Sequence, residues 1–402
     1  MSPRLARLRA DLEGGKHGAL EAFWAEVAER GAPLQEEPLP GSTDPSVTLL
    51  WRDATSASVL VGGGLSGRPP GLSLERLPGT DAWHRTLALP SDMRTLYWFV
   101  PGGDLEDWRS WRADRLNPAR FVYFEADDAT GAPAVEVSIL ELVDAPANAW
   151  IQPRPGVPRG HTESLTLTSG ILGNERRVDM YRPAEVEPGE KDGFGLFVML
   201  DGTEYVDRLA ITTILDNLIG DGAVPPMIGV FLDSLSQDVR SLEMGCYPPF
   251  NAFLERELLP LAERIGPVSR NPGRRIIGGS SFGGLAAAFA GLLLPEVFGG
   301  VLSQSGAFQW RRAGEDEPAW LERNLPVAPI STRFSVRVGT LEEFDIRIIN
   351  ESVGLLEANR RMRRALEGRR AEVMYREFSG GHDDVCWQQL MAEQLVELTA
   401  RS

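Results

Sequence analysis

Residues 274–285 read RRIIGGSSFGGL, and this stretch decides the fold class of the chain. It contains the pattern Gly-x-Ser-x-Gly centred on Ser281, because a pattern centred on Ser280 would need glycine where Phe282 stands. An apolar run precedes the pattern, and an alanine-rich helical run, 285–290, follows it. The stretch therefore predicts a strand that turns sharply into a helix, which lifts the hydroxyl of Ser281 above a sheet on a strained backbone.

Such a serine needs a base, and His382 is the predicted one. The chain has four histidines, of which His382 alone follows Ser281. In α/β-hydrolases the nucleophile, the acid and the histidine occur in that order along the chain. A neutral imidazole would accept the serine proton and return it to the leaving group. The other interpretation is a histidine that makes only local hydrogen bonds near the start of the last helix.

The acid that orients the imidazole should follow a strand lying between the serine and the histidine. Residues 334–338 read as such a strand, and Glu342, Glu343 and Asp345 come shortly after it. We expect Glu342 to be the acid, with Glu343 as the second candidate and Asp345 as the third. The two aspartates that directly follow His382 are too close to it in sequence for this role.

Two backbone N–H groups are expected to hold the oxyanion that forms when a serine attacks a carbonyl. One is the N–H of Phe282, directly after the nucleophile. The other should come from the loop after an earlier strand, 197–199, which points to Asp201 or Gly202. Alternatively, Asp201 only caps a helix that begins near Val206.

The second half of the chain alternates short apolar runs with helical patterns, which is typical of a mostly parallel sheet covered on both faces. The predicted strands are 164–167, 177–181, 196–200, 227–232, 274–277, 301–304, 334–338 and 373–378. The predicted helices are 206–218, 250–265, 285–294, 353–366 and 385–398. We therefore predict an α/β protein whose catalytic domain, an α/β-hydrolase, covers residues 158–402.

The first half has a different character. Residues 3–30 show helical spacing of leucines and aromatic residues, and a proline-rich stretch ends the helix. Short β-like runs follow at 47–51, 58–61, 72–77, 83–89 and 96–100. Between about 104 and 160 prolines are frequent and periodic runs are few, so a linker is expected near Pro153, Pro155 and Pro158. The sequence predicts a smaller β-sandwich domain over residues 1–157, with a leading helix.

Composition excludes several classes of function. Asp and Glu outnumber Lys and Arg by 57 to 41, a formal net charge of −16, whereas a nucleic-acid partner needs a basic face. No apolar run is long enough to span a membrane, and residues 1–31 lack the apolar core of a secretory signal, so a cytoplasmic enzyme is expected. Cys246 and Cys386 lack both metal-ligand spacing and a nucleophile motif. We expect no metal and no cofactor.

Several motifs together resemble the enterochelin (enterobactin) esterase family, part of the esterase D-like group of α/β-hydrolases. In the second half the similar stretches are 200–202, Arg240 with Glu243, 257–260, 279–285, 302–306 and 380–387. In the first half they are 79–83 and 114–118. The resemblance implies a cytoplasmic serine esterase that hydrolyses the trilactone backbone of a ferric catecholate siderophore, enterobactin or a relative, and so releases iron.

An anionic ferric siderophore conflicts with an acidic protein unless local arginines line the cleft. The expected cationic contacts are Arg240, Arg311 and Arg312, and the expected faces for catecholate rings are Trp310 and Trp387. For each arginine the alternative is a solvated surface role. Two other functions stay open: an esterase D-like carboxylester hydrolase of feruloyl or acetyl type, and a catalytically inactive binding protein.

Overall fold

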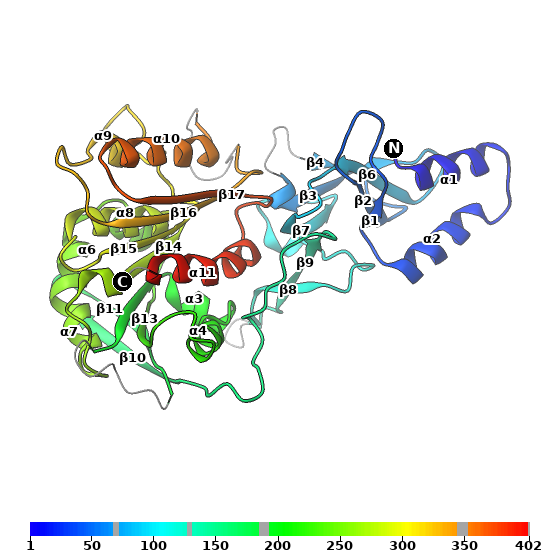
Figure 1. Ribbon diagram of the computed structural model, residues 1–402. Helices are drawn as coiled ribbons and strands as arrows, with labels where there is room; N and C mark the ends of the chain where they lie inside the picture. Colours follow the sequence, from blue (N-terminus) through cyan, green and yellow to red (C-terminus); the bar gives the residue numbers. More distant parts are fainter. Residues whose placement is uncertain (67–71, 127–130, 185–192, 344–352, 401–402) are drawn as a thin grey trace. The chain divides into compact units, whose positions relative to one another are not determined.

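The structure is a computed structural model that describes residues 1–66, 72–126, 131–184, 193–343 and 353–400 (Figure 1). Its chain divides into two compact units. The first comprises Met1–Ala147 together with Ser379–Cys386, and the second comprises Asn148–Phe378 together with Trp387–Ser402. In sequence the short segment Ser379–Cys386 lies between two parts of the second unit, but it packs with the first unit.

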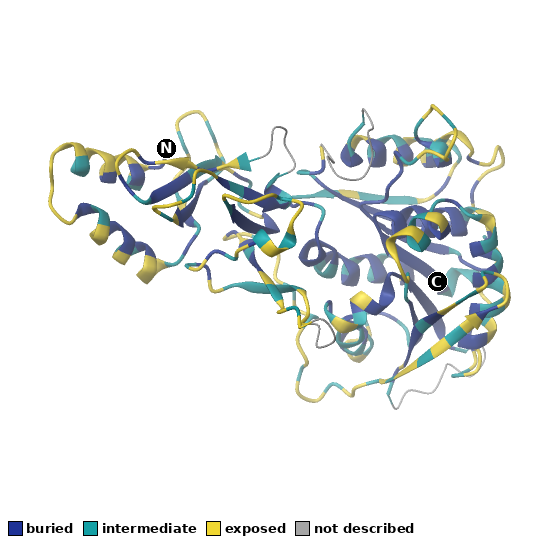
Figure 2. Cartoon of the chain, turned by 180° about the vertical axis from the view of Figure 1, so that it is seen from behind, coloured by how far each residue is buried: buried dark blue, intermediate teal, exposed yellow. Residues whose placement is uncertain are grey.

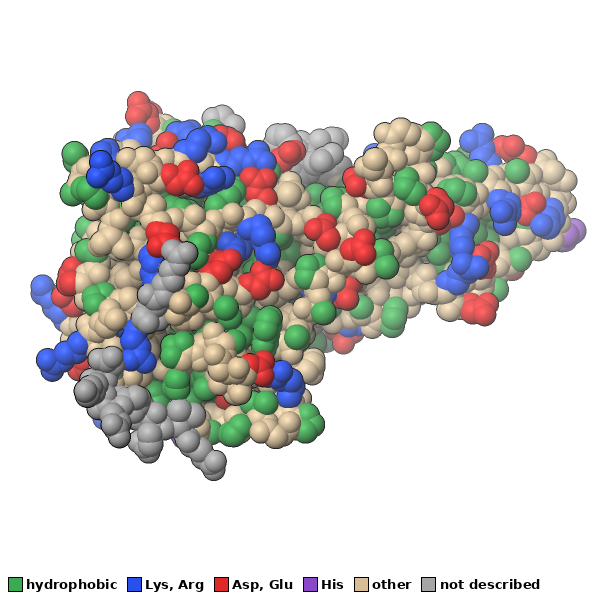
Figure 3. Space-filling view, in the orientation of Figure 1, with side chains coloured by type: hydrophobic (Ala, Val, Ile, Leu, Met, Phe, Trp, Pro, Cys, Tyr) green, Lys and Arg blue, Asp and Glu red, His purple; other side chains and the backbone are tan. Residues whose placement is uncertain are grey.

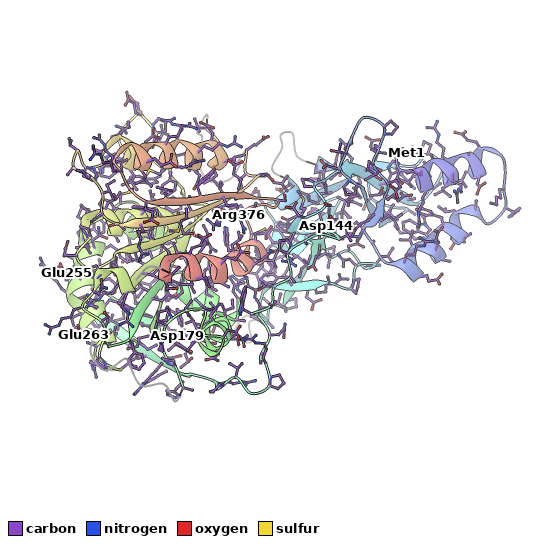
Figure 4. The ribbon with its side chains drawn as sticks, in the orientation of Figure 1. Met1, Asp144, Asp179, Glu255, Glu263 and Arg376 are labelled. Carbon is purple, nitrogen blue, oxygen red and sulfur yellow. The ribbon has the colours of Figure 1, made fainter. Side chains whose placement is uncertain are left out.

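Within the described residues, the second unit contains a sheet of eight strands in the order β10-β11-β13-β12-β14-β15-β16-β17. All neighbours from β13 to β17 are parallel, and β10 and β11 run antiparallel at one edge. In Figure 4 two labelled residues help to locate opposite edges of the sheet: Asp179 lies on β11, next to one edge strand, and Arg376 lies on β17, the other edge strand. The strands are β10 (His161–Ser169), β11 (Asn174–Arg182), β12 (Gly195–Leu200), β13 (Met227–Leu232), β14 (Arg275–Ser280), β15 (Gly300–Gln304), β16 (Arg333–Gly339) and β17 (Val373–Phe378).

Helices cover this sheet because its inner strands, β12 to β16, are buried on both faces, as Figure 2 shows. One core combines alternate strand residues, such as Val198 and Ile277, with apolar side chains of α6, α8 and α10. The helices are α3 (Gly202–Asp207), α4 (Ile211–Gly220), α5 (Gln237–Glu243), α6 (Pro248–Phe253), α7 (Leu259–Ala262), α8 (Phe282–Leu293), α9 (Trp320–Arg323), α10 (Leu355–Gly368) and α11 (Asp384–Thr399). Together with the comparisons reported below, this strand order confirms the predicted α/β-hydrolase fold.

The first unit is built from two antiparallel sheets and two helices. One sheet has the order β1-β2-β6-β5 and the other β4-β3-β7-β9-β8. The helices pack with Leu34, Leu50 and Leu77 in one core, and Trp98 and Trp111 belong to another. The elements are α1 (Pro3–Glu13), α2 (Ala19–Arg30), β1 (Leu34–Glu36), β2 (Ser46–Arg52), β3 (Val59–Gly63), β4 (Leu72–Ser73), β5 (Glu75–Arg76), β6 (Ala82–Ala88), β7 (Arg94–Pro101), β8 (Arg120–Phe124) and β9 (Val135–Glu141).

Several predicted elements are divided in the structure. The single helix predicted over 3–30 is wrong: α1 ends at Glu13 and α2 begins at Ala19, because Gly15 and Gly18 between them adopt positive φ angles of 69° and 74°. The strand predicted over 72–77 is two strands, β4 and β5, that belong to different sheets. The helix predicted over 206–218 is also divided, since α3 ends at Asp207 and Ala210 takes a φ of 55° before α4.

Other elements were absent from the prediction. The proline-containing stretch 104–160 holds β8 and β9, which pair antiparallel with a register shift between Val122 and Phe124. Helices α5 and α9 are short, with seven and four residues, and their patterns are too brief for a periodicity to be recognised. The predicted helix over 250–265 contains a π-helical turn, Leu254–Leu258, just before Pro260, whose missing N–H interrupts the α-helical hydrogen bonds.

The two units divide at Ala147/Asn148 rather than at the predicted 157/158. The proline-rich linker packs on α4 of the second unit, where the side-chain amide of Asn217 donates hydrogen bonds to the carbonyls of Trp150 (2.7 Å) and Gln152 (2.9 Å). The guanidinium of Arg154 in turn donates to the Asn217 side chain at 3.0 Å. These contacts place 148–157 with the second unit.

The surface in Figure 3 carries basic and acidic side chains side by side. Helix α10 is rich in arginine, yet Arg360, Arg361 and Arg364 form ion pairs with glutamates. Arg376 on β17 pairs with Glu393 of α11. Such exposed pairs contribute little to stability, but they neutralise the positive charge of each arginine locally.

Candidate active site

Ser281 lies at the turn between β14 and α8, with φ of 56° and ψ of −119°. A positive φ is costly for a residue with a side chain, so this conformation is held by its surroundings. The flanking glycines permit it, because a Cβ atom on Gly279 would lie 2.4 Å from the carbonyl carbon of Gly283. The predicted sharp turn from strand to helix is therefore present, and its glycines are required by close backbone packing.

The backbone of Ser281 is held on both sides. Its N–H donates to the carbonyl of Gln304 on β15 (2.9 Å), and its own carbonyl accepts from the N–H groups of Leu285 (3.1 Å) and Ala307 (2.9 Å). The buried Gln304 side chain accepts a hydrogen bond from the Tyr205 hydroxyl (2.9 Å) and donates to Gln394. Gln304 was predicted only as part of a family motif, and its role as the support of the nucleophile turn depends on partners distant in sequence.

The predicted oxyanion loop lies beside the start of α8. Asp201 directly follows β12 and has a φ of 53°, and α3 begins at Gly202. An added Cβ on Gly283 would lie 3.2 Å from the Asp201 carboxylate, so the two turns are adjacent. Phe282 and Gly202 each occupy the first position of a helix, where the N–H has no acceptor within the helix. This arrangement can supply two backbone donors to an oxyanion.

The alternative role for Asp201, a side-chain cap of a helix beginning near Val206, is wrong. The helix begins at Gly202, and the Asp201 side chain makes no capping hydrogen bond. Its carboxylate instead accepts two hydrogen bonds from the guanidinium of Arg240, at 2.8 and 2.7 Å. The Arg240 guanidinium also lies 5.7 Å from the ring centroid of Phe282. Burial lowers the pKa of Arg240, but attraction to Asp201 outweighs it and the pKa is raised.

Glu342 is buried, with 3% exposure, just after β16. Its Oε1 atom accepts hydrogen bonds from the hydroxyl of Ser305 and the N–H of Gly339, both at 2.6 Å. The second candidate acid, Glu343, is exposed, and the third, Asp345, lies outside the described residues. A carboxylate held by two donors is well suited to orienting an imidazole, so the geometry favours Glu342 over Glu343.

His382 is half-buried in the segment Ser379–Cys386, which packs within the first unit, whereas Ser281 and Glu342 belong to the second. The neighbouring Asp383 is engaged elsewhere: its carboxylate accepts hydrogen bonds from the Thr95 hydroxyl and the Leu96 N–H. Burial raises the pKa of Asp383. The expectation that Asp383 is not the orienting acid agrees with these contacts.

A cleft of about 760 Å³ is formed in the second unit by the end of α5, the turn after it and the loop 310–316. Trp310 and Arg312 line it, and the Arg312 guanidinium lies 4.3 Å from the ring centroid of Trp320. The Trp310 N–H donates to the carbonyl of Ala307, whose own N–H donates to Ser281. Trp310, in one wall of the cleft, is thus three residues along the chain from Ala307, which contacts the nucleophile Ser281. The volume of the cleft suits a small molecule.

Trp387 and the two cysteines are buried. Trp387 is 8% exposed, and its ring N–H donates to the Ser305 hydroxyl at 3.1 Å. Cys246 lines the cleft but is buried, and burial raises its thiol pKa well above the usual range. Cys386 is also buried, with its Sγ 3.1 Å from the carbonyl of Arg94. No cluster of His, Cys, Asp and Glu suited to a metal occurs among the described residues, and none of their helices is long and apolar enough to cross a membrane.

Two family models match the chain in tandem. The model described as "Enterochelin esterase, N-terminal" matches residues 46–151, and that described as "Putative esterase" matches residues 169–398. The iron(III) enterobactin esterase of Dickeya dadantii is 31% identical, over 92% of this chain and 90% of its own.

Solved structures extend the similarity to the whole fold. The ferric enterobactin esterase of Salmonella typhimurium superimposes with a TM-score of 0.76 at 26% identity, covering 95% of this chain and 99% of its own. The enterobactin esterase of Shigella flexneri, crystallised in the presence of enterobactin, gives 0.72 at 27% identity, over 96% and 99% of the two chains.

Proposed function

This chain belongs to the enterochelin esterase family and is a carboxylic ester hydrolase, and we propose that it is a serine esterase opening the trilactone backbone of a ferric catecholate siderophore, enterobactin or a relative. The observation that carries the serine mechanism is the conformation of Ser281, a positive-φ residue between a buried strand and α8. The observation that carries the substrate is similarity across both units, including the N-terminal one.

In the proposed reaction the Ser281 hydroxyl attacks an ester carbonyl while His382 accepts its proton. The N–H of Phe282, with that of Asp201 or Gly202, holds the negative charge that develops on the carbonyl oxygen. Glu342 orients the imidazolium. The acyl carbon–oxygen bond of the ring then breaks, and the proton passes from His382 to the released alkoxide. The ring opens to a chain that has an alcohol at one end and is bound as an ester to Ser281 at the other. Water, deprotonated by His382, hydrolyses that ester and restores the serine.

We place the substrate's aromatic, anionic arms in the cleft bearing Trp310 and Arg312. An aromatic ring and a guanidinium in one wall suit a catecholate, since the ring offers a stacking face and the guanidinium offers charge. Arg240 acts on the site indirectly, by holding Asp201, because two nitrogens of its guanidinium donate hydrogen bonds to that carboxylate. The acidic side chains Glu315 and Asp316 also line the cleft, so the attraction is local and not a property of the whole acidic surface.

A substrate panel with an active-site probe tests this function. We expect a fluorophosphonate to add one group to Ser281, seen by mass spectrometry, and the enzyme to hydrolyse ferric enterobactin with a higher kcat/KM than p-nitrophenyl or feruloyl esters. Activity confined to the simple esters would support the feruloyl or acetyl type of hydrolase. Absence of the Ser281 adduct would support a binding protein.

We propose that the reaction takes place in the cytoplasm and releases iron there for reduction. Two buried cysteines without a disulfide between them suit a reducing compartment. Fractionation of the native host, with antibody detection and markers for each compartment, tests the location. Recovery of the protein with the extracytoplasmic markers would contradict it.

A further inference from the structure

The segment that carries His382 packs on strand β7 of the first unit. The Arg94 N–H donates to the carbonyl of Ser379 (3.1 Å), and Cys386 at the other end of the segment contacts the carbonyl of the same Arg94 (3.1 Å). Both ends of Ser379–Cys386 are therefore tied to the first residue of β7, 285 to 292 positions earlier in the chain.

Asp383, next to His382, ties down the middle of the segment. Its Oδ2 accepts hydrogen bonds from the Thr95 hydroxyl and from the Leu96 N–H (3.0 Å), while its Oδ1 accepts from the Cys386 N–H (3.2 Å). The side chain is 6% exposed. A buried carboxylate with three donors is costly to disturb, since loss of one leaves a buried polar group short of a partner.

Close backbone packing completes the contact. A Cβ atom on Gly381 would lie 2.4 Å from the Cα of Gly64, and one on Gly64 would lie 2.0 Å from the Thr95 hydroxyl oxygen and 3.1 Å from Asp383. Neither glycine position can hold a side chain without movement. Gly381, Gly64, Thr95 and Asp383 therefore form one interlocked cluster, which we call the β7 anchor.

We propose that the β7 anchor is a positioning device for catalysis, through which the N-terminal unit holds the His382 loop in its working conformation. This rests on the proposed role of His382 as the base. The anchor touches no reacting atom; it acts by limiting how far the imidazole can stray, and displacement of a catalytic group by about 1 Å can cost on the order of 100-fold in rate.

Thr95→Val tests the proposal, because valine keeps the shape of threonine and removes the hydroxyl donor. With p-nitrophenyl butyrate we expect kcat per fluorophosphonate-titrated site to fall about 10- to 100-fold, with KM changed less than about twofold. Thr95→Ser, which restores the hydroxyl, should recover kcat to within about threefold. Gly64→Ala disturbs the anchor from the other side and should lower kcat in the same way.

Thr48→Val is the matched control. Thr48 is a fully buried threonine of the same unit, 3.1 Å from the hydroxyl of Thr86, and it lies on the other sheet. Loss of the Thr48 hydroxyl should lower Tm as Thr95→Val does, but it should leave kcat per titrated site unchanged. Equal kcat losses in the two variants, or wild-type kcat in both Thr95→Val and Gly64→Ala, would overturn the anchor.

His382→Ala, measured in parallel, separates this inference from the function beneath it. Wild-type activity in His382→Ala would reject both proposals, that His382 is the base and that the β7 anchor positions it. Loss of activity in His382→Ala with full activity in the anchor variants would leave the base in place and reject the anchor alone.

Discussion

At the scale of single residues, Glu342 and its two hydrogen-bond donors distinguish the proposed acid from its exposed neighbour. Glu342→Gln should lower kcat on the order of 100-fold, because the amide cannot stabilise the imidazolium charge. Ser281→Ala and His382→Ala should each cost more. Glu343→Gln is the matched control and should retain wild-type kcat. Steady-state kinetics decide the matter, and a larger loss in Glu343→Gln would move the acid by one position.

Ser305 and Trp387 form the support of that acid. Ser305, at a φ of 49°, donates to Glu342 and accepts from the Trp387 ring N–H. Trp387→Phe removes this N–H while keeping an aromatic ring in the core. If the ring acts through Ser305, kcat should fall about three- to tenfold with KM for ferric enterobactin unchanged. A raised KM for ferric enterobactin with normal kcat would instead support the predicted contact between Trp387 and a catecholate ring.

Arg312 should act on binding alone. Arg312→Ala should raise KM for a ferric catecholate siderophore about tenfold, ~1.4 kcal/mol, and leave KM for p-nitrophenyl butyrate unchanged, since the small ester does not fill the cleft. The wild-type KM for the siderophore should also rise with ionic strength. Arg364→Ala, which removes an exposed arginine paired with Glu357, serves as control. Equal effects on both substrates would argue against the cleft as the site of the catecholate arms.

The thiols should be inert in the folded protein. Both cysteines are buried, and burial raises the pKa of Cys246, so little thiolate forms at pH 8. We expect iodoacetamide to leave mass and activity unchanged until the chain is denatured, when two adducts appear. Modification of the native protein with loss of activity would show that a thiol is accessible and required.

At the scale of elements, the turn from β14 to α8 depends on the absence of a side chain at Gly279. Gly279→Ala should shift the turn and remove most fluorophosphonate labelling of Ser281, with a stability cost of about 1–3 kcal/mol from overpacking. Gly368→Ala is the control, because a Cβ there meets no atom within 4 Å. Normal labelling in Gly279→Ala would mean that the turn tolerates a Cβ.

Element boundaries were predictable where pattern and burial coincide. Strands β12 to β16 of the second unit are buried on both faces, so their apolar runs stand out. Strand β17 is only partly buried, yet it coincides with the predicted 373–378. Strands β8 and β9 were missed because they lie among prolines and are only partly buried. The leading helix was predicted too long because leucine spacing continues across the glycines at 14, 15 and 18, whose conformations end it.

At the scale of the whole molecule, the positions of Ser281, Glu342 and the loop after β12 were predictable, because each follows a strand of one parallel sheet and such strand ends meet at one edge. The β7 anchor was not predictable, since it joins Thr95 to Asp383 across most of the chain. The contact of Gln304 with Ser281 was not predictable either, because the partners of Gln304 are also distant in sequence. Local patterns predict candidate reacting residues, and long-range packing determines which residues hold them in place.

The central claim, that Ser281 carries the acyl group of the substrate, is tested most directly by rapid quench of the enzyme with ferric enterobactin, followed by mass spectrometry of the peptide containing 275–285. We predict a transient adduct on Ser281 of one substrate acyl group, absent in Ser281→Ala, that decays as ring-opened product accumulates. Product formed by Ser281→Ala at the wild-type rate, with no adduct on the wild-type peptide, would contradict the claim.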